Sequence, residues 1–113
     1  MYYYKMEAIY IISTKKLAKE NKYKVGRHTG SKDLVLSKYA KYIDDPKIYY
    51  FSKLENRCIS KAINTAIKKY KIKITGIPFS FVSMNIDQLI NCIDDIFDML
   101  LPSYDGDDTF DIN

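Results

Sequence analysis

The sequence has few of the residues on which several common kinds of site depend. It contains one histidine, two cysteines and four glycines among 113 residues. A structural zinc site uses about four ligands, so zinc binding is not expected. We expect Cys58 and Cys92, which fall on apolar helix faces, to be buried, reduced thiols. Catalytic triads, P-loops and dinucleotide fingerprints are also absent, and no glycine-rich cradle surrounds the turn framed by Gly26 and Gly30.

Long apolar runs are missing too. No stretch of 18 apolar residues occurs, so no membrane-spanning helix is expected. Residues 1–5 lack the charged-then-apolar order of a signal peptide, which favours an intracellular protein, in the host cytoplasm or nucleus if it is viral. The length and the 47% of hydrophobic residues predict a single domain over residues 1–104, followed by an acidic, disordered tail at 105–113.

Charge is segregated along the chain. All 18 lysines and arginines lie between Lys5 and Lys73, together with only six acidic residues, so this part has a net charge of +12. From Thr75 onward there are eight aspartates and no basic residue, a net charge of −8. A basic field attracts phosphate backbones. The acidic part can be a solvated face, a partner of the basic part within the molecule, or a mimic of nucleic acid.

The pattern of apolar residues predicts an α+β domain with a small antiparallel three-stranded sheet flanked by helices. Runs rich in β-branched and aromatic residues predict strands at 8–13, 22–27 and 47–53. Helical periodicity predicts helices at about 32–43, 55–71 and 86–101. The polar stretch 14–21 fits a long loop or one helical turn, and residues 72–83 fit one or two short strands.

Several segments resemble the GIY-YIG nuclease superfamily over roughly residues 8–100. The resemblance is carried by Ile9-Tyr10-Ile11, by the run from Tyr23 to Ser31 (YKVGRHTGS), by Asp45-Pro46 and by Ile48 to Phe51 (IYYF). It is strongest to the divergent branch common in large DNA viruses and phages, related to a phage T5 open reading frame. The resemblance implies the order β-β-α-β-α and cleavage of DNA phosphodiesters with one divalent metal, Mg²⁺ or Mn²⁺.

The resemblance also implies site residues. Tyr10 falls on the tyrosine of the first motif and Gly26 on the glycine of the second. Lys24 occupies the second tyrosine position and Tyr23 is one residue away, so on a strand Tyr23 would face the opposite side. With Arg27 and His28 at the strand end, the candidate catalytic set is Tyr10, Tyr23, Arg27 and His28. Tyr10 also has a structural interpretation as a core or half-buried strand aromatic, and His28 has one as a surface turn residue.

Two functional groups of the family are missing at their expected positions. The arginine of the first helix falls at Leu34 or Val35, and the metal-binding glutamate of the second helix falls near Ser60. Arg27 can replace the arginine from the strand end, but Glu55 lies more than a helical turn from the glutamate position. The sequence therefore predicts a nuclease-like domain with a degenerate site, and a metal site is not assigned.

We expect DNA to be the partner of this domain. The predicted contacts come from the second strand, from the start of the first helix and from a basic row on the second helix: Lys22, Lys24, Arg27, Lys32, Arg57, Lys61 and Lys68. The alternative interpretation treats the row on the second helix as a solvated surface. Gly26 and Gly30 are interpreted as backbone requirements. Two alternatives stay open: an active endonuclease, and a protein-interaction module whose acidic helix and tail engage a basic protein or a second copy in a homodimer.

Overall fold

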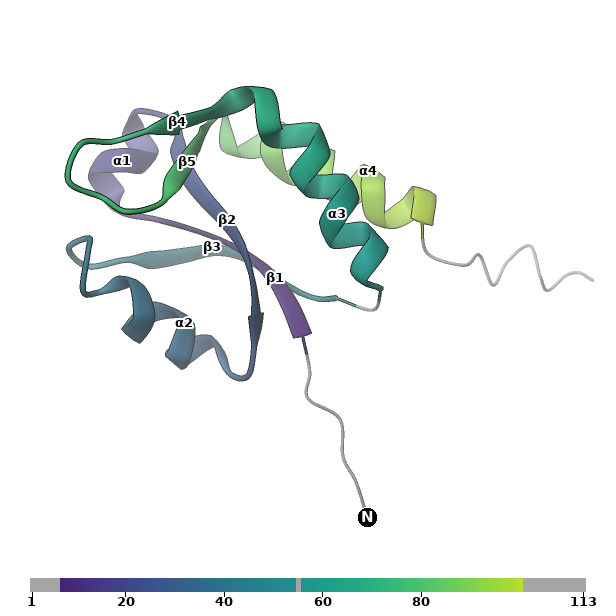
Figure 1. Ribbon diagram of the computed structural model, residues 1–113, viewed down its shortest axis with the longest axis horizontal. Coiled ribbons are helices and arrows are strands. Elements are labelled where there is room, and N and C mark those ends of the chain that lie inside the picture. Colours follow the sequence, from purple (N-terminus) through teal and green to yellow (C-terminus); the bar gives the residue numbers. More distant parts are fainter. Residues whose placement is uncertain (1–6, 55, 101–113) are drawn as a thin grey trace, which may run out of the picture.

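The computed structural model describes residues 7–54 and 56–100, which form an α+β fold with one antiparallel sheet (Figure 1). The sheet has five strands in the order β3-β1-β2-β5-β4, with β1 (Glu7–Ser13) buried between its neighbours. The remaining strands are β2 (Lys22–Thr29), β3 (Lys47–Lys53), β4 (Lys71–Lys73) and β5 (Ser80–Ser83). The predicted tail at 105–113 lies outside the described residues.

The three-stranded sheet predicted from the sequence is therefore wrong in size. Two short strands, β4 and β5, extend it beyond β2, and β5 pairs with β2 only through Lys22↔Ser83 and Tyr23↔Val82. The connection between β4 and β5 contains Gly76, whose φ of 87° suits glycine. Strands this short carry too little alternation to define a pairing partner that is distant in the sequence.

The helices are α1 (Lys15–Lys19), α2 (Lys32–Tyr39), α3 (Arg57–Ile67), the 3₁₀ turn η1 (Lys68–Tyr70) and α4 (Ile86–Leu100). The helix α3 begins after Asn56, whose side chain accepts the backbone N–H of Cys58 at 2.8 Å. This cap places Cys58 in the first, solvent-facing turn, so its thiol is exposed, contrary to the prediction, and Cys92 is half-buried. None of the helices in the described ranges has the length and apolar character that crossing a bilayer requires.

Alternation along the strands produces one hydrophobic core on each face of the sheet. On the face covered by α3 and α4, Ile9, Ile11 and Tyr23 pack with the buried side chains of both helices. On the other face, Tyr10 and Ile12 pack with α2 and with Phe81 of β5. These are called the α3 face and the α2 face below. In Figure 1 the end of β2 lies between the helices of the two faces.

Candidate nucleic-acid interface

The second half of β2 is an open edge of the sheet. On one side β2 pairs with β1 from Ile12↔Lys24 to Glu7↔Thr29. On its other side β5 reaches only Lys22 and Tyr23, so within the described part of the chain residues 24–29 have no strand neighbour there. Side chains of this edge point alternately toward the α2 face and the α3 face. A ligand at this edge can therefore contact groups from both faces.

This alternation separates the four candidate catalytic residues. Tyr10 and His28 lie on the α2 face, where their ring centroids are 6.5 Å apart. Arg27 lies on the α3 face, where its side chain approaches Glu7. Tyr23 belongs to the core of that same α3 face. The four residues therefore do not converge on one site.

Both candidate tyrosines are core residues. Tyr10 is 1% exposed, and its hydroxyl lies 2.5 Å from that of Tyr39 of α2. Burial, and then the hydrogen bond to Tyr39, raises the pKa of Tyr10 well above its ordinary value. Tyr23 donates its hydroxyl to the carbonyl of Ala18 at 3.3 Å, and its ring meets Tyr49 edge-on. Neither hydroxyl is placed to meet a phosphate from solution.

His28, Gly26 and Gly30 have structural roles at the open edge of β2 and in the turn that follows it. The Nε2 atom of His28 lies 3.1 Å from the carbonyl oxygen of Ser31, which ties the strand to the start of α2. Gly30 has a φ of 119°, a backbone conformation that side chains disfavour. A Cβ atom on Gly26 would lie 2.5 Å from Cζ of Tyr10, so only glycine lets that ring cross β2.

A groove runs between the open edge of β2 and α3. It encloses about 380 Å³, and its apolar floor is formed by Ile9, Val25, Ile63 and Ile67. Its polar lining comes from both walls, namely Gly26 and Arg27 of β2 and Ser60, Lys61 and Asn64 of α3. We call it the β2–α3 groove. It brings Arg27 into one hollow with Lys61 of the basic row on α3, a residue 34 positions further along the chain.

Positive charge dominates the rim of this groove. The side chain of Arg27 is 44% exposed, and its Nε lies 4.0 Å from one carboxylate oxygen of Glu7. The other oxygen of Glu7 accepts a hydrogen bond from Arg57 at 3.0 Å. Lys71 of β4 donates to the side-chain oxygen of Asn64 at 2.8 Å, which adds a further cation that was not predicted from the sequence. One carboxylate thus faces two arginines, and a net positive field remains.

The groove does not fit a catalytic divalent metal. Ser60, the position of the family's metal-binding glutamate, lies in the groove but offers only a hydroxyl. Among the described residues that line the groove there is no aspartate or glutamate. Across residues 7–54 and 56–100, no group of three or more His, Cys, Asp or Glu side chains is arranged to hold a metal ion. Glu55 lies outside the described residues. The lining therefore suits an anion better than a cation.

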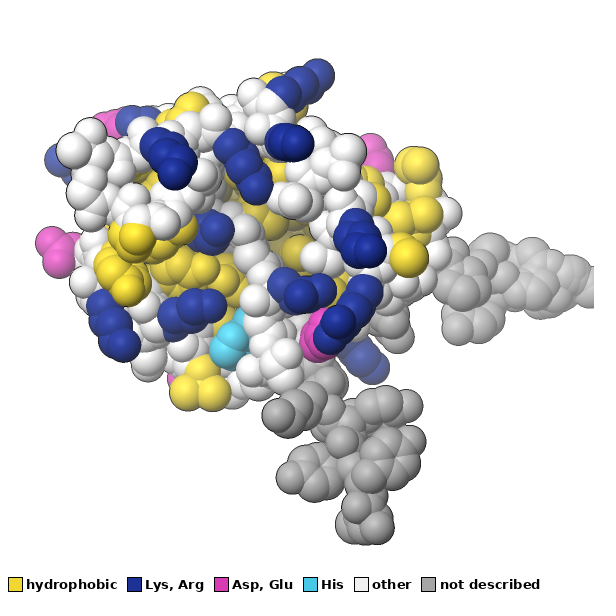
Figure 2. All heavy atoms as spheres, in the orientation of Figure 1, with side chains coloured by type: hydrophobic (Ala, Val, Ile, Leu, Met, Phe, Trp, Pro, Cys, Tyr) yellow, Lys and Arg dark blue, Asp and Glu magenta, His cyan; other side chains and the backbone are white. Residues whose placement is uncertain are grey.

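The other predicted basic contacts divide between the faces. Lys22 forms an ion pair with Glu20 at 2.7 Å, and Lys24 is half-buried with its Nζ 5.5 Å from the ring centre of Phe79. Lys32 begins α2, Arg57 begins α3, and Lys68 follows the last residue of α3. Figure 2 shows Lys and Arg side chains spread over the face that presents β2, α2 and α3, with few acidic side chains among them. Lys38 of α2 was not among the basic residues predicted from the sequence.

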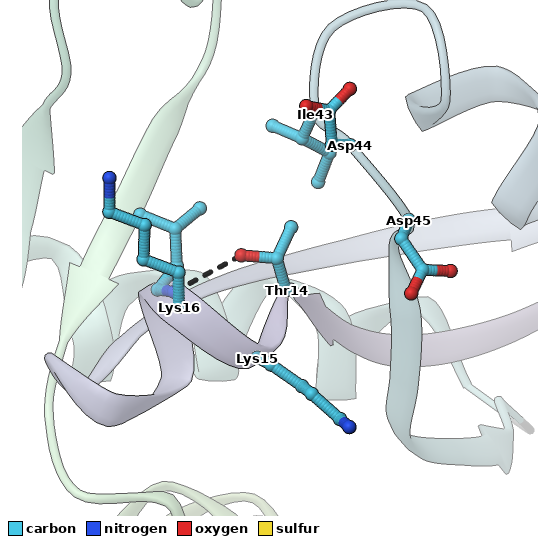
Figure 3. Close-up of a pocket in the computed structure, with 7 residues that line it drawn as sticks. Thr14, Lys15, Lys16, Ile43, Asp44 and Asp45 are labelled. Carbon is cyan, nitrogen blue, oxygen red and sulfur yellow. Dashed lines mark hydrogen bonds between the residues drawn. The ribbon is translucent and has the colours of Figure 1, made fainter.

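A second hollow, of about 310 Å³, lies between α1 and the connection from α2 to β3. Lys15 and Lys16 come from one wall and Asp44 and Asp45 from the other (Figure 3). Thr14 is occupied as the cap of α1, since its hydroxyl oxygen accepts the N–H of Leu17 at 3.1 Å. The mixed charge makes this hollow a poor site for phosphate. Its two exposed lysines, Lys15 and Lys16, are therefore suitable controls for the basic residues of the β2–α3 groove.

The acidic helix α4 packs beside α3 and turns its aspartates to solvent. Asp87, Asp94, Asp95 and Asp98 are all exposed. Asp94 accepts a hydrogen bond from Tyr50 at 2.9 Å, and no ion pair within the described ranges involves an aspartate of α4. The acidic surface of α4 therefore makes no direct ion pair with the basic residues of the described ranges.

Comparison with known proteins gives one viral relative. The chain is similar to the uncharacterized protein R10 of Acanthamoeba polyphaga mimivirus, with 32% identity over 88 residues. The match covers 76% of this chain but only 23% of that protein, so the chain spans about a quarter of the relative's length. No protein-family model matches the chain. No solved structure matches it either.

Proposed function

We propose that this chain is a nucleic-acid-binding domain of viral or mobile-element origin, related to the GIY-YIG nucleases, whose nuclease site has degenerated. The observation that carries the proposal is the β2–α3 groove, which is lined both by Arg27 of the open sheet edge and by Lys61 of α3. The elements β1, β2, α2, β3 and α3 follow the order that the resemblance implies, with the short helix α1 inserted. The mimivirus relative supports a viral origin.

The groove suits a phosphate backbone for a physical reason. Arginine presents several donors in a planar fork and lysine a compact cation, and both bind phosphate oxygens. Asn64 and Ser60 add neutral polar groups, and Gly26, whose opposite side is covered by the ring of Tyr10, lines the groove with its backbone. Contacts of this kind fix the position of a duplex without reading its sequence.

Loss of cleavage follows from the same residues. A nuclease of this kind needs a carboxylate that holds its metal and a group that activates water. The groove offers Ser60 at the carboxylate position, and Tyr10 is buried against Tyr39 on the opposite face. These two facts favour binding without hydrolysis over the alternative of an active endonuclease.

The test combines binding with cleavage. We expect a fluorescein-labelled DNA duplex to bind at low salt, and supercoiled plasmid to stay intact after incubation with Mg²⁺ or Mn²⁺. Robust nicking that disappears in Tyr10→Phe would restore the endonuclease interpretation. Absence of duplex binding at low salt would remove the proposal.

A second candidate function rests on α4. Its exposed aspartates form an acidic face that no described basic residue neutralises, which suits a basic protein or the basic body of a second copy. Sedimentation at low and high salt distinguishes this candidate. A salt-sensitive dimer without duplex binding would favour the interaction module.

A further inference from the structure

A row of aromatic rings crosses the α2 face and ends at the surface. The ring centroids of Tyr10 and Tyr39 are 5.9 Å apart, those of Tyr39 and Phe79 5.0 Å, and those of Phe79 and Tyr42 5.9 Å, all nearly edge-to-face. Tyr10 and Tyr39 are buried, Phe79 is half-buried, and Tyr42 is 51% exposed. Packing against this row holds Tyr42 in place while leaving much of it open to solvent.

Lysines are interleaved with the same rings. The Nζ atoms of Lys24 and Lys38 lie 5.5 Å and 5.6 Å from the ring centres of Phe79 and Tyr39. Burial, and then repulsion from Lys71 and Lys38, lowers the pKa of Lys24. Neither lysine takes part in an ion pair within residues 7–54 and 56–100. These cations repel each other in the free protein, so an added anion would relieve the repulsion.

We call the set of Lys24, Lys38, Tyr39, Tyr42 and Phe79 the aromatic–lysine surface. In Figure 2, hydrophobic side chains between α2 and the β4–β5 connection form an area bordered by Lys and Arg. Exposed aromatic rings beside cations match the chemistry of a single nucleic-acid strand, whose bases stack on rings while its phosphates meet the cations. A duplex offers little to such a ring, because its bases are already stacked on each other.

We propose that the aromatic–lysine surface binds single-stranded nucleic acid, with a base stacked on Tyr42 and the flanking phosphates held by Lys24 and Lys38. This inference rests on the proposed function and extends it to a second surface on the opposite face of the sheet. The open edge of β2 separates the two surfaces, so a strand that leaves a duplex in the β2–α3 groove would meet Tyr42 across that edge.

The test measures fluorescence anisotropy of a labelled oligothymidylate and of a labelled duplex of equal length. Tyr42→Ala is expected to weaken binding of the single strand about tenfold, the loss of roughly one base stack, and to leave duplex binding unchanged. Tyr42→Phe should retain wild-type affinity for the strand. Tyr70→Ala is the matched control, because Tyr70 is an exposed tyrosine with Lys69 5.3 Å from its ring centre but lies on η1.

The outcomes separate this inference from the proposed function. Duplex binding that depends on Arg27 and Lys61, with single-strand binding unaffected by Tyr42→Ala, would overturn the aromatic–lysine surface and leave the proposed function intact. Failure of both ligands to bind at low salt would overturn both. Equal losses in Tyr42→Ala and Tyr70→Ala would also overturn the assignment, since they would point to non-specific binding. Circular dichroism verifies that each variant is folded.

Discussion

The ring of Tyr10 on β1 lies directly over Gly26, its partner on β2. The two residues pair across the strands, and a Cβ atom on Gly26 would come within 2.5 Å of the tyrosine Cζ. Because Tyr10 is 1% exposed and held by Tyr39, the ring has no room to move aside. This packing gives both residues a structural role at the centre of the sheet.

The close approach of these two residues predicts a specific loss of stability. Gly26→Ala should lower the free energy of unfolding by about 1–3 kcal/mol through overpacking, as measured by urea denaturation. In Gly26→Ala/Tyr10→Leu the two effects should be less than additive, since the shorter side chain relieves the collision. Full additivity would show that the two residues do not interact.

The paired hydroxyls of Tyr10 and Tyr39 predict a second pattern. Tyr10→Phe should cost about 1–3 kcal/mol because it leaves the buried hydroxyl of Tyr39 without its partner. The double variant Tyr10→Phe/Tyr39→Phe should be closer to wild type than either single variant, because no polar group is then left unpaired. Duplex affinity should be unchanged in all three. A selective loss of binding in Tyr10→Phe would contradict the structural role.

Stability should fall at alkaline pH. Burial raises the pKa of Tyr10 and Tyr39, and burial with the bond to Asp94 raises the pKa of Tyr50 to about 12. In the unfolded chain these hydroxyls lose their protons from about pH 10, whereas in the folded protein they keep them to higher pH. The stability that the raised pKa values contribute is therefore complete below about pH 10 and is lost as the pH rises above it. Burial also raises the pKa of Tyr23 and Cys92, so the lowered pKa of Lys24, which acts in the opposite sense, is one group against five.

Urea unfolding at about pH 8 and about pH 11 measures this effect. The wild type should lose stability over this interval, and Tyr10→Phe/Tyr39→Phe should lose less because two of the five groups with a raised pKa are gone. An equal loss in both proteins would assign the pH dependence to other residues.

The carboxylate of Glu7 should weaken binding of a DNA duplex. Its carboxylate faces Arg27 at 4.0 Å and Arg57 at 3.0 Å, so it offsets positive charge beside the β2–α3 groove. Glu7→Gln should tighten duplex binding several-fold at low salt and leave cleavage absent. Asp98→Asn, which removes one exposed carboxylate from α4, is the matched control and should have a smaller effect. Unchanged affinity in Glu7→Gln would place the duplex elsewhere.

Sequence patterns predicted the elements that carry strong periodicity. The strand at 47–53 and the helix beginning at Ile86 were predicted with the bounds that the structure gives or within one residue of them, because aromatic content and a full apolar stripe define them. The strands β4 and β5 could not be placed in the sheet, since their pairing depends on distant segments coming together. The helix α2 was predicted too long: it ends at Tyr39 rather than at Ile43, and a local turn follows in which the N–H groups of Tyr42 and Ile43 donate to the carbonyl of Tyr39.

The site was predictable only in part. Arg27 and the basic row containing Lys61 could be identified from residue type and helical spacing. Their meeting in one groove with Ser60 depends on how α3 crosses the edge of β2, which no local pattern encodes. The expectation that Tyr10, Arg27 and His28 share a site was wrong because side chains alternate along a strand. Arg27 precedes His28 on β2, so its side chain lies on the α3 face while that of His28 lies on the α2 face.

The most direct test of binding at the β2–α3 groove is the salt dependence of duplex affinity in matched charge variants. Anisotropy titrations over a salt series should give a linear log–log plot whose slope changes by about 0.9 for each phosphate that the protein no longer neutralises. Arg27→Ala/Lys61→Ala should weaken binding and flatten the slope by the amount expected for nearly two phosphates. Lys15→Ala/Lys16→Ala, which removes the same charge, should change the slope little. Equal changes in the two double variants would contradict binding at the β2–α3 groove.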